Sequence, residues 1–172
     1  GETSRPKFRY HGQDLAGKDF SRLPGDIAWV IGASMIIRRE VYESVGGFDE
    51  DFFLYGEEAD LCLRVREAGF QIGYIRDVCV HHAGGQSESG NSAYDMWRRR
   101  ENGKYTFYRK HYDADTVRRL VTHRVRRARR RLFWLNLKGA LGRLSDRECR
   151  RHEKYQAVCD AGGSFLDGRA RG

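Results

Sequence analysis

The sequence predicts an α/β fold that continues into basic α-helices, and three observations support this prediction. An apolar, β-branched run over residues 27–37 (IAWVIGASMII) is typical of a buried strand, and its central glycine indicates a close approach of another group. Helical spacing follows over residues 38–45 and 57–68, with short apolar strands over 70–82. Beyond residue 117, apolar residues recur at intervals of three and four among arginines, which predicts amphipathic helices.

A length of 172 residues leaves room for one domain with a core of its own. We predict an irregular polar segment over 1–25, the α/β part over 26–112, a basic helical tail over 113–160 and a disordered terminus over 161–172. The chain starts at Gly1 within polar sequence, which we interpret as the interior of a longer protein.

The charge is positive and concentrated in one region. The chain carries 32 Lys and Arg against 24 Asp and Glu, a formal net charge of +8, and eight arginines lie between Arg118 and Arg131. This surplus favours anionic partners. The widely spaced cysteines include no C-x-x-C pair, and we interpret them as free thiols in a reducing compartment. The sequence shows neither a leader nor an apolar run of about eighteen residues, so we expect a cytoplasmic protein.

Five motifs occur in order between Gly32 and Ser87: a glycine-alanine strand, R-R-x-x-[FY], G-G-F-D-E-x-F-F, an acidic pair before D-L-x-x-R, and H-x-G-G-x-S. Together they resemble the acceptor-side half of family-2 glycosyltransferases with the GT-A (Rossmann-like) fold, especially the rhamnosyltransferase-like and galactofuranosyltransferase-like branches. The resemblance covers about residues 27–112. It implies an inverting transfer of a sugar from a nucleotide-diphosphate sugar to a glycan or lipid-linked acceptor.

The acidic pair is the predicted catalytic element. By the resemblance its second member, Glu58, is the general base that takes the proton of the acceptor hydroxyl, and Glu57 is the next candidate. The family usually has aspartate at the position of Glu58, so the reach here differs by one methylene. Without the flanking motifs, both residues and Asp60 would be interpreted as acids that complement a helix dipole. Asp60 is also expected to pair with Arg64 one turn further on.

A divalent cation, Mn²⁺ or Mg²⁺, is the cofactor that the resemblance implies. Its candidate ligand is His82, 24 residues after Glu58, and an imidazole suits Mn²⁺ better than Mg²⁺. His81 competes for this role because neighbouring strand residues face opposite sides. No aspartate-x-aspartate motif precedes Ile27, so we expect the chain alone to lack the nucleotide-binding half and to be inactive.

Further candidates for binding the donor or acceptor lie in the strand, in the turn before the acidic helix and in a polar glycine-rich loop. An ordinary buried strand, core aromatic packing and a flexible loop would explain the same residues. The set comprises Trp29, Gly32, Ala33, Tyr55, Asp60, Gly84, Gly85 and Ser87.

The predicted basic helix over residues 117–135 has an apolar stripe of Leu120, Val125, Leu132 and Phe133, with Trp134 at its edge. This stripe suits an anionic leaflet, which would place the protein peripherally on the inner face of the plasma membrane. Packing of the helix against the core explains the stripe equally well. We do not expect nucleic acid binding, because the segment matches no recognition motif. The alternative to an enzyme, which only the basic tail supports, is a membrane-surface or nucleic-acid-binding module without catalysis.

Overall fold

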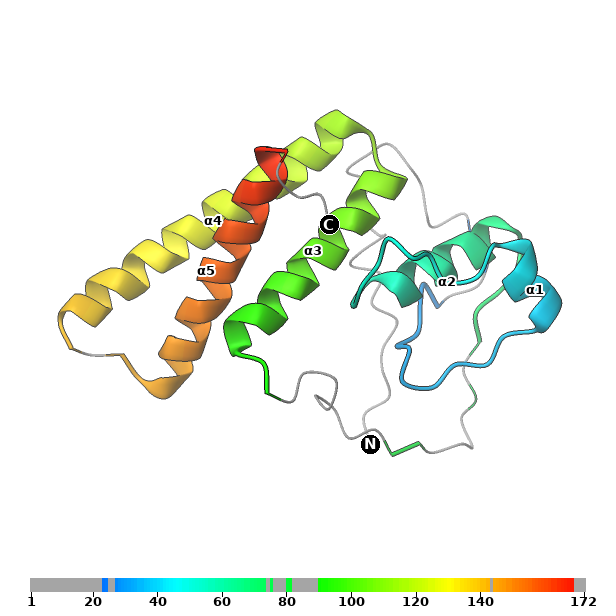
Figure 1. Cartoon of the computed structure of the whole chain (residues 1–172), viewed down its shortest axis with the longest axis horizontal. Coiled ribbons are helices and arrows are strands. Elements are labelled where there is room, and N and C mark those ends of the chain that lie inside the picture. The colour runs from blue at the N-terminus through cyan, green and yellow to red at the C-terminus, as the bar shows by residue number, and fades with distance from the viewer. Residues whose placement is uncertain are drawn as a thin grey trace. The chain divides into compact units, whose positions relative to one another are not determined.

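The computed structural model describes residues 23–24, 27–73, 75, 80–81, 90–142 and 144–168. The described helices are α1 (Arg39–Ser44), α2 (Glu57–Glu67), α3 (Ala93–His111), α4 (Ala114–Ala140) and α5 (Asp146–Leu166) (Figure 1). The chain divides into two compact units, residues 1–84 and 85–172. This division lies before α3, earlier than the boundary expected at residue 113, because α3 packs with α4 and α5.

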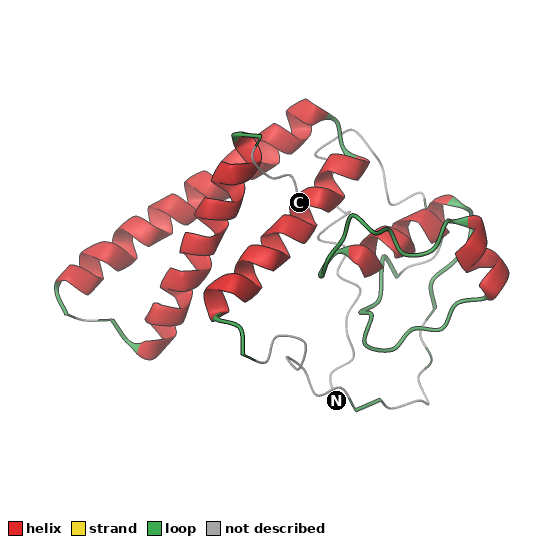
Figure 2. Cartoon of the chain, in the orientation of Figure 1, coloured by secondary structure: helices red, strands yellow, loops and turns green. Residues whose placement is uncertain are grey.

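The prediction of an α/β fold is wrong. The part of the chain that the structure describes is helical and contains no strand, and therefore no Rossmann-like sheet (Figure 2). Residues 27–38 are irregular, with a turn after Ile31. A strand is stabilised by hydrogen bonds to a neighbouring strand, and an apolar run supplies only one side of that ladder. Ile31 and Ile36 are 55% and 90% exposed, so the run is not buried between two layers.

The predicted strands over 70–82 fall partly outside the described residues. Residues 70–73, 75 and 80–81 are described, and none of them is in a strand. Both predicted helices of this unit are present, as α1 and α2.

A small core holds the described part of the first unit together. Val41 of α1 packs with Leu61 and Val65 of α2, and the side chains of Met35 and Ile37 pack against this cluster. The consecutive residues Leu61, Cys62 and Leu63 are all buried, so α2 is covered on more than one face. The irregular segment before α1 is therefore fastened to α2 by side-chain packing.

The turn after α1 is fixed by glycine and by one arginine. Gly47 has φ of +68°, and a Cβ there would lie 2.9 Å from the Tyr42 ring, so both conformation and space require glycine. Arg64 of α2 donates to the carbonyl oxygens of Val45 and Gly47. Its ion pair with Asp60, at 2.7 Å, is the one predicted from their spacing.

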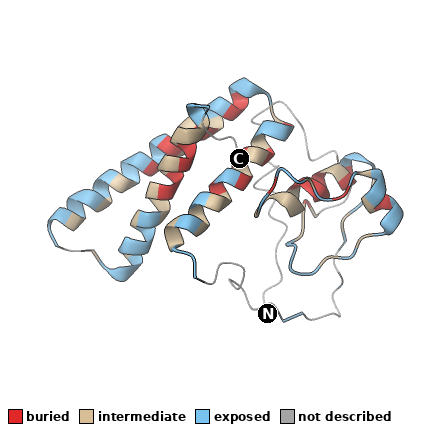
Figure 3. Ribbon diagram, viewed as in Figure 1, coloured by how far each residue is buried: buried red, intermediate tan, exposed pale blue. Residues whose placement is uncertain are grey.

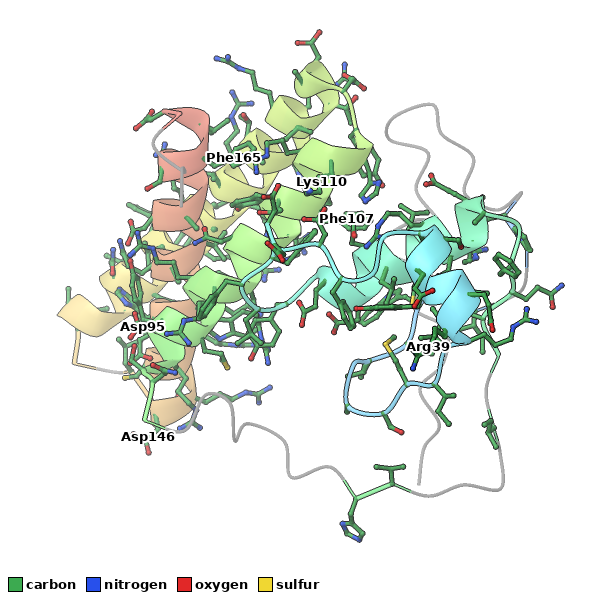
Figure 4. The ribbon with its side chains drawn as sticks, turned by 45° about the vertical axis from the view of Figure 1, so that its right-hand side comes forward. Arg39, Asp95, Phe107, Lys110, Asp146 and Phe165 are labelled. Atoms are coloured by element: carbon green, nitrogen blue, oxygen red, sulfur yellow. The ribbon has the colours of Figure 1, made fainter. Side chains whose placement is uncertain are left out.

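The second unit is a bundle of α3, α4 and α5, in which α4 and α5 run antiparallel (Figure 1). Its core contains Tyr105 of α3, Val121 and Val125 of α4 and Ala161 of α5. Phe165, labelled in Figure 4, packs at the edge of this core, where its ring is tilted against that of Tyr105 with the two centroids 5.3 Å apart. The buried residues gather on the faces that the three helices turn toward one another (Figure 3).

Each helix of this bundle is capped at its N-terminus by a side chain. Ser92 accepts a hydrogen bond from the Asp95 backbone N–H, and Asp113 accepts one from that of Thr116. At α5, Ser145 and Glu148 form a capping box. Such caps satisfy backbone N–H groups that the first turn leaves unpaired, so the helix starts are set by the sequence itself.

Two expectations about the tail need correction. Val125, assigned to a lipid-facing stripe, is buried in the bundle core, and Leu120 and Leu132 are half-buried, whereas Phe133 is 62% exposed. Most of the predicted stripe therefore serves helix packing. In addition, α5 continues to Leu166, so residues 161–166 are helical instead of disordered. None of the described helices is long and apolar enough to cross a membrane.

Candidate active site

The start of α2 carries the predicted acidic pair. Gly56, with φ of +108°, lies immediately before the helix, and Tyr55 has φ of +70°, a left-handed conformation that is uncommon for a residue with a side chain. This turn delivers Glu57 and Glu58 as the first two helical residues. Strained backbone of this kind is often found next to functional sites, where the surrounding structure maintains it.

Glu58 is anchored at the helix start. Its Oε2 accepts a hydrogen bond from the Gly56 backbone N–H at 3.3 Å. The positive end of the helix dipole favours a carboxylate at this position. The side chain is half-buried, so Glu58 is held in place while part of it is open to solvent.

Glu57 occupies a different environment. Its Oε2 atom is buried and has no hydrogen-bond partner among the described residues. Burial raises the pKa of Glu57 above its ordinary value, backbone hydrogen bonding by Glu57 itself opposes this, and the charge of Glu58 raises the pKa further. Glu57 therefore holds its proton to higher pH than an ordinary glutamate.

The segment predicted to bind the donor passes beside this helix start. A Cβ built on Gly32 would lie 3.9 Å from the Glu58 Cβ, an ordinary contact distance. Burial raises the pKa of the Cys62 thiol, to which the Val30 backbone hydrogen-bonds, and the charge of Glu58 acts in the same direction as burial. The structure therefore brings Gly32 and Glu58 together, although they are 26 residues apart in sequence.

The other candidates in this unit have varied surroundings. Trp29 and Tyr55 are half-buried, whereas Ala33 is exposed. Asp60 is buried and accepts two hydrogen bonds from Arg64, so its contacts are structural. His82, Gly84, Gly85 and Ser87 lie outside the described residues, and the competing His81 is exposed.

A cation site is not formed by the described residues. Within them, no group of three or more His, Cys, Asp or Glu side chains could hold a metal ion. The predicted ligand His82 is not among the described residues. The chemistry that can be derived for this site is proton transfer at the acidic pair.

Two residues of α2 that contact the segment before α1 were not predicted from the sequence. Cys62 lies one turn after Glu58 and is buried beside the segment around Val30. Arg66 is buried and donates to the carbonyl oxygens of Pro24 and Leu23, 42 and 43 residues away. Contacts over such separations leave no local pattern in the sequence.

The acidic helix start, the glycine segment beside it and the G-G-F-D-E turn lie within a stretch that matches one protein family. The chain belongs to the glycosyl transferase family group 2, whose family model matches residues 8–145.

Several curated proteins are similar over part of the chain. The rhamnosyltransferase WbbL of Escherichia coli (strain K12) is 31% identical over 46% of this chain and 30% of its own length. The N-acetylglucosaminyl-diphospho-decaprenol L-rhamnosyltransferase of Mycobacterium tuberculosis (strain ATCC 25618 / H37Rv) is 38% identical over 33% of this chain and 18% of its own length. The O-antigen biosynthesis protein RfbC of Myxococcus xanthus is 39% identical over 40% of this chain and 6% of its own length.

The chain thus spans 30% or less of the length of these relatives. No solved structure matches it significantly.

Proposed function

We propose that this chain is the acceptor-side part of an enzyme that transfers a sugar from a nucleotide-diphosphate sugar to a glycan or lipid-linked acceptor. Its family membership and its similarity to proteins named as rhamnosyltransferases support this proposal. One relative is named for a decaprenol-linked acceptor, which favours a lipid-linked acceptor here.

The observation that carries the proposal is the pair of adjacent carboxyl groups at the start of α2, with Gly32 beside Glu58. A carboxylate that is fixed in place and partly open to solvent can take the proton of a hydroxyl group bound beside it. Glu58, fixed by the Gly56 N–H, is the proposed general base. Glu57, whose pKa is raised by burial and by the charge of Glu58, is the neighbour that favours its proton-bound form.

The proposed step is a single displacement. Glu58 takes the proton from the acceptor hydroxyl as that oxygen forms a bond to the anomeric carbon of the donor. The bond from this carbon to the diphosphate breaks, and its electron pair leaves with the nucleoside diphosphate. Attack from the side opposite the leaving group inverts the anomeric centre. Gly32, which has no side chain and lies beside Glu58, leaves room for a sugar at this point.

The remaining assignments stay predictions. Trp29, Ala33 and Tyr55 are proposed donor or acceptor contacts from the same unit. The donor half of the reaction is proposed to need residues beyond this chain, since the similarity covers only 30% and 18% of the length of two of its relatives. We therefore expect the 172-residue chain to show no specific binding of nucleotide-diphosphate sugars in calorimetry, with or without Mn²⁺. Tight and specific binding would overturn this division of labour.

The test is Glu58→Gln in the complete enzyme to which we propose this chain belongs. An amide keeps the shape of the side chain but cannot take the proton, so kcat should fall by about 10²–10⁴ while donor affinity stays nearly unchanged. Glu67→Gln is the matched control, because Glu67 is an exposed residue at the other end of α2.

The outcomes separate the candidates. Near-normal turnover in Glu58→Gln with a large loss in Glu57→Gln would move the base to Glu57. Near-normal turnover in both variants would refute the assignment of the base to this helix.

A further inference from the structure

The outward face of α4 is divided into a basic part and an apolar part. We call it the outer ridge, and its members recur at intervals of three and four, as residues on one helix face do. They lie opposite Val121, Val125 and Ala128, which are buried in the bundle. In Figure 3 this side of α4 is largely exposed. The outer ridge consists of His123, Arg126, Arg127, Arg130, Phe133, Trp134, Leu137 and Leu141.

The basic part carries exposed positive charges. Arg126, Arg127 and Arg130 are exposed, and among the described residues none forms an ion pair with them. Together with His123 and Arg131 they line a groove of about 480 Å³. Like charges three and four residues apart on a helix repel one another. An anionic partner in this groove would remove that repulsion.

The apolar part follows directly on the same face. Phe133 and Trp134 are each 62% exposed, Leu137 is 48% exposed and Leu141 is 64% exposed. The two aromatic rings meet edge to face with centroids 5.7 Å apart. Four large apolar side chains within nine residues form a concentrated exposed patch, which in proteins commonly marks an interaction site.

This end of α4 is held in place by α5. Arg131 donates to the Tyr155 hydroxyl at 2.6 Å, Asn136 bonds His152 at 2.7 Å, and Lys138 pairs with Glu148 at 2.6 Å. The apolar part of the outer ridge is therefore presented by an ordered helical hairpin.

We propose that the outer ridge is a docking surface for an anionic lipid bilayer. The helix would lie along the membrane, with Trp134, Leu137 and Leu141 at the boundary between headgroups and acyl chains and the arginines on lipid phosphates. The ridge extends about 27 Å along the helix axis, enough to engage several headgroups. A nucleic acid would use the arginines but would leave the leucines exposed to water, so the two parts together favour a bilayer.

The test is co-sedimentation of the full 172-residue chain with vesicles of equal parts phosphatidylglycerol and phosphatidylcholine, compared with phosphatidylcholine alone. We expect binding to the anionic vesicles that weakens as salt is raised. Arg126→Gln/Arg130→Gln should weaken binding by roughly 30-fold, since each arginine near the surface contributes about a factor of five. Trp134→Ser/Leu137→Ser should weaken binding by at least about tenfold.

Matched controls separate the ridge from general charge and general hydrophobicity. Arg118→Gln/Arg129→Gln removes the same charge from another face of α4, and Ile36→Ser removes an apolar side chain that is 90% exposed in the other unit. Both should leave binding within about twofold of the parent chain. Circular dichroism of each variant checks that the helices are intact.

Three outcomes would overturn the proposal: no binding to the anionic vesicles, equal losses in the ridge and control variants, or tighter binding to an oligonucleotide that is unaffected by Trp134→Ser/Leu137→Ser. The assay needs no sugar transfer, so its result is independent of the proposed catalytic role.

Discussion

At the scale of single residues, Glu57 is the most unusual side chain of the first unit. One of its carboxylate oxygens is buried without a hydrogen-bond partner among the described residues, and burial raises its pKa. A group of this kind costs stability when it is ionised. Side chains with shifted pKa values are common at functional sites, even where they lower the stability of the protein. We therefore include Glu57 with Glu58 in the candidate site.

Glu57→Gln tests this cost. An acid with a raised folded pKa holds its proton to higher pH in the folded state than in the unfolded state, so stability falls as pH rises through that interval. The thermal midpoint of Glu57→Gln at pH 7 should therefore equal or exceed that of the parent, and the difference should shrink toward pH 4. Glu67→Gln, on the exposed end of α2, should change little at either pH.

The result to look for is the sign of the change in scanning calorimetry. A markedly lower midpoint for Glu57→Gln at pH 7 would mean that the carboxylate makes a stabilising contact, contrary to its described surroundings.

At the scale of elements, α5 shows why two adjacent glycines have different roles. Gly162 is buried where α5 meets the other helices, and a Cβ there would lie 2.3 Å from Val125 Cγ2 and 3.3 Å from the Tyr105 hydroxyl. A Cβ on Gly163 would meet nothing within 4 Å. Gly162 thus permits close packing of the bundle, whereas Gly163 has no packing requirement.

Gly162→Ala should destabilise the bundle by about 1–3 kcal/mol, because the added methyl group overpacks the core. Gly163→Ala should be neutral or stabilising by up to about 1 kcal/mol, because alanine is the better helix former. Urea unfolding of both variants, followed by circular dichroism, measures the two free energies directly. Equal effects in both variants would contradict the packing described for Gly162.

At the scale of the whole molecule, the bundle depends on a buried ionic cluster that joins α3 to α4. Glu101 is fully buried and accepts hydrogen bonds from Arg124, from Lys104 at 3.0 Å and from the Tyr105 hydroxyl at 3.2 Å. Burial by itself would raise the pKa of Glu101, but the hydrogen bond from Arg124 and the charge of Lys104 outweigh it and hold the pKa below its ordinary value. Glu101 is therefore ionised in the folded protein at neutral pH.

This cluster predicts how the second unit responds to acid. A carboxyl group with a lowered folded pKa stabilises the protein above its unfolded pKa of about 4.5, and this contribution is lost as pH falls through the folded value. Glu101→Gln should cost about 1–3 kcal/mol at pH 7, since it takes the charged hydrogen-bond acceptor away from the half-buried Arg124 and Lys104. Below pH 4.5 the free energy of unfolding of the Glu101→Gln variant should also depend less on pH than that of the parent chain.

Glu153→Gln is the control, because Glu153 is an exposed residue of α5. Urea unfolding between pH 3 and pH 7 distinguishes the two variants. A loss of less than 1 kcal/mol in Glu101→Gln would show that the cluster is energetically neutral.

The sequence by itself determined the family of this protein, the acidic pair, the helical stretches and the Asp60–Arg64 pair. Each of these depends on residues a few positions apart: apolar spacing along a helix, caps such as Asp113 and Ser145, or the order of short motifs. Local interactions of this kind are visible in a linear pattern.

Only the tertiary structure decided whether residues 27–37 form a strand, which side of α4 faces the bundle, and what surrounds Glu101. Each of these outcomes depends on groups that are distant in sequence: a neighbouring strand for the apolar run, α3 and α5 for Val125, and Arg124 for Glu101. The amino-acid pattern of an apolar run is the same whether or not a second strand pairs with it. The pattern of an apolar helical stripe is likewise the same whether it faces protein or lipid. Burial and backbone pairing are properties of contacts between segments, which is why the sequence alone left them open.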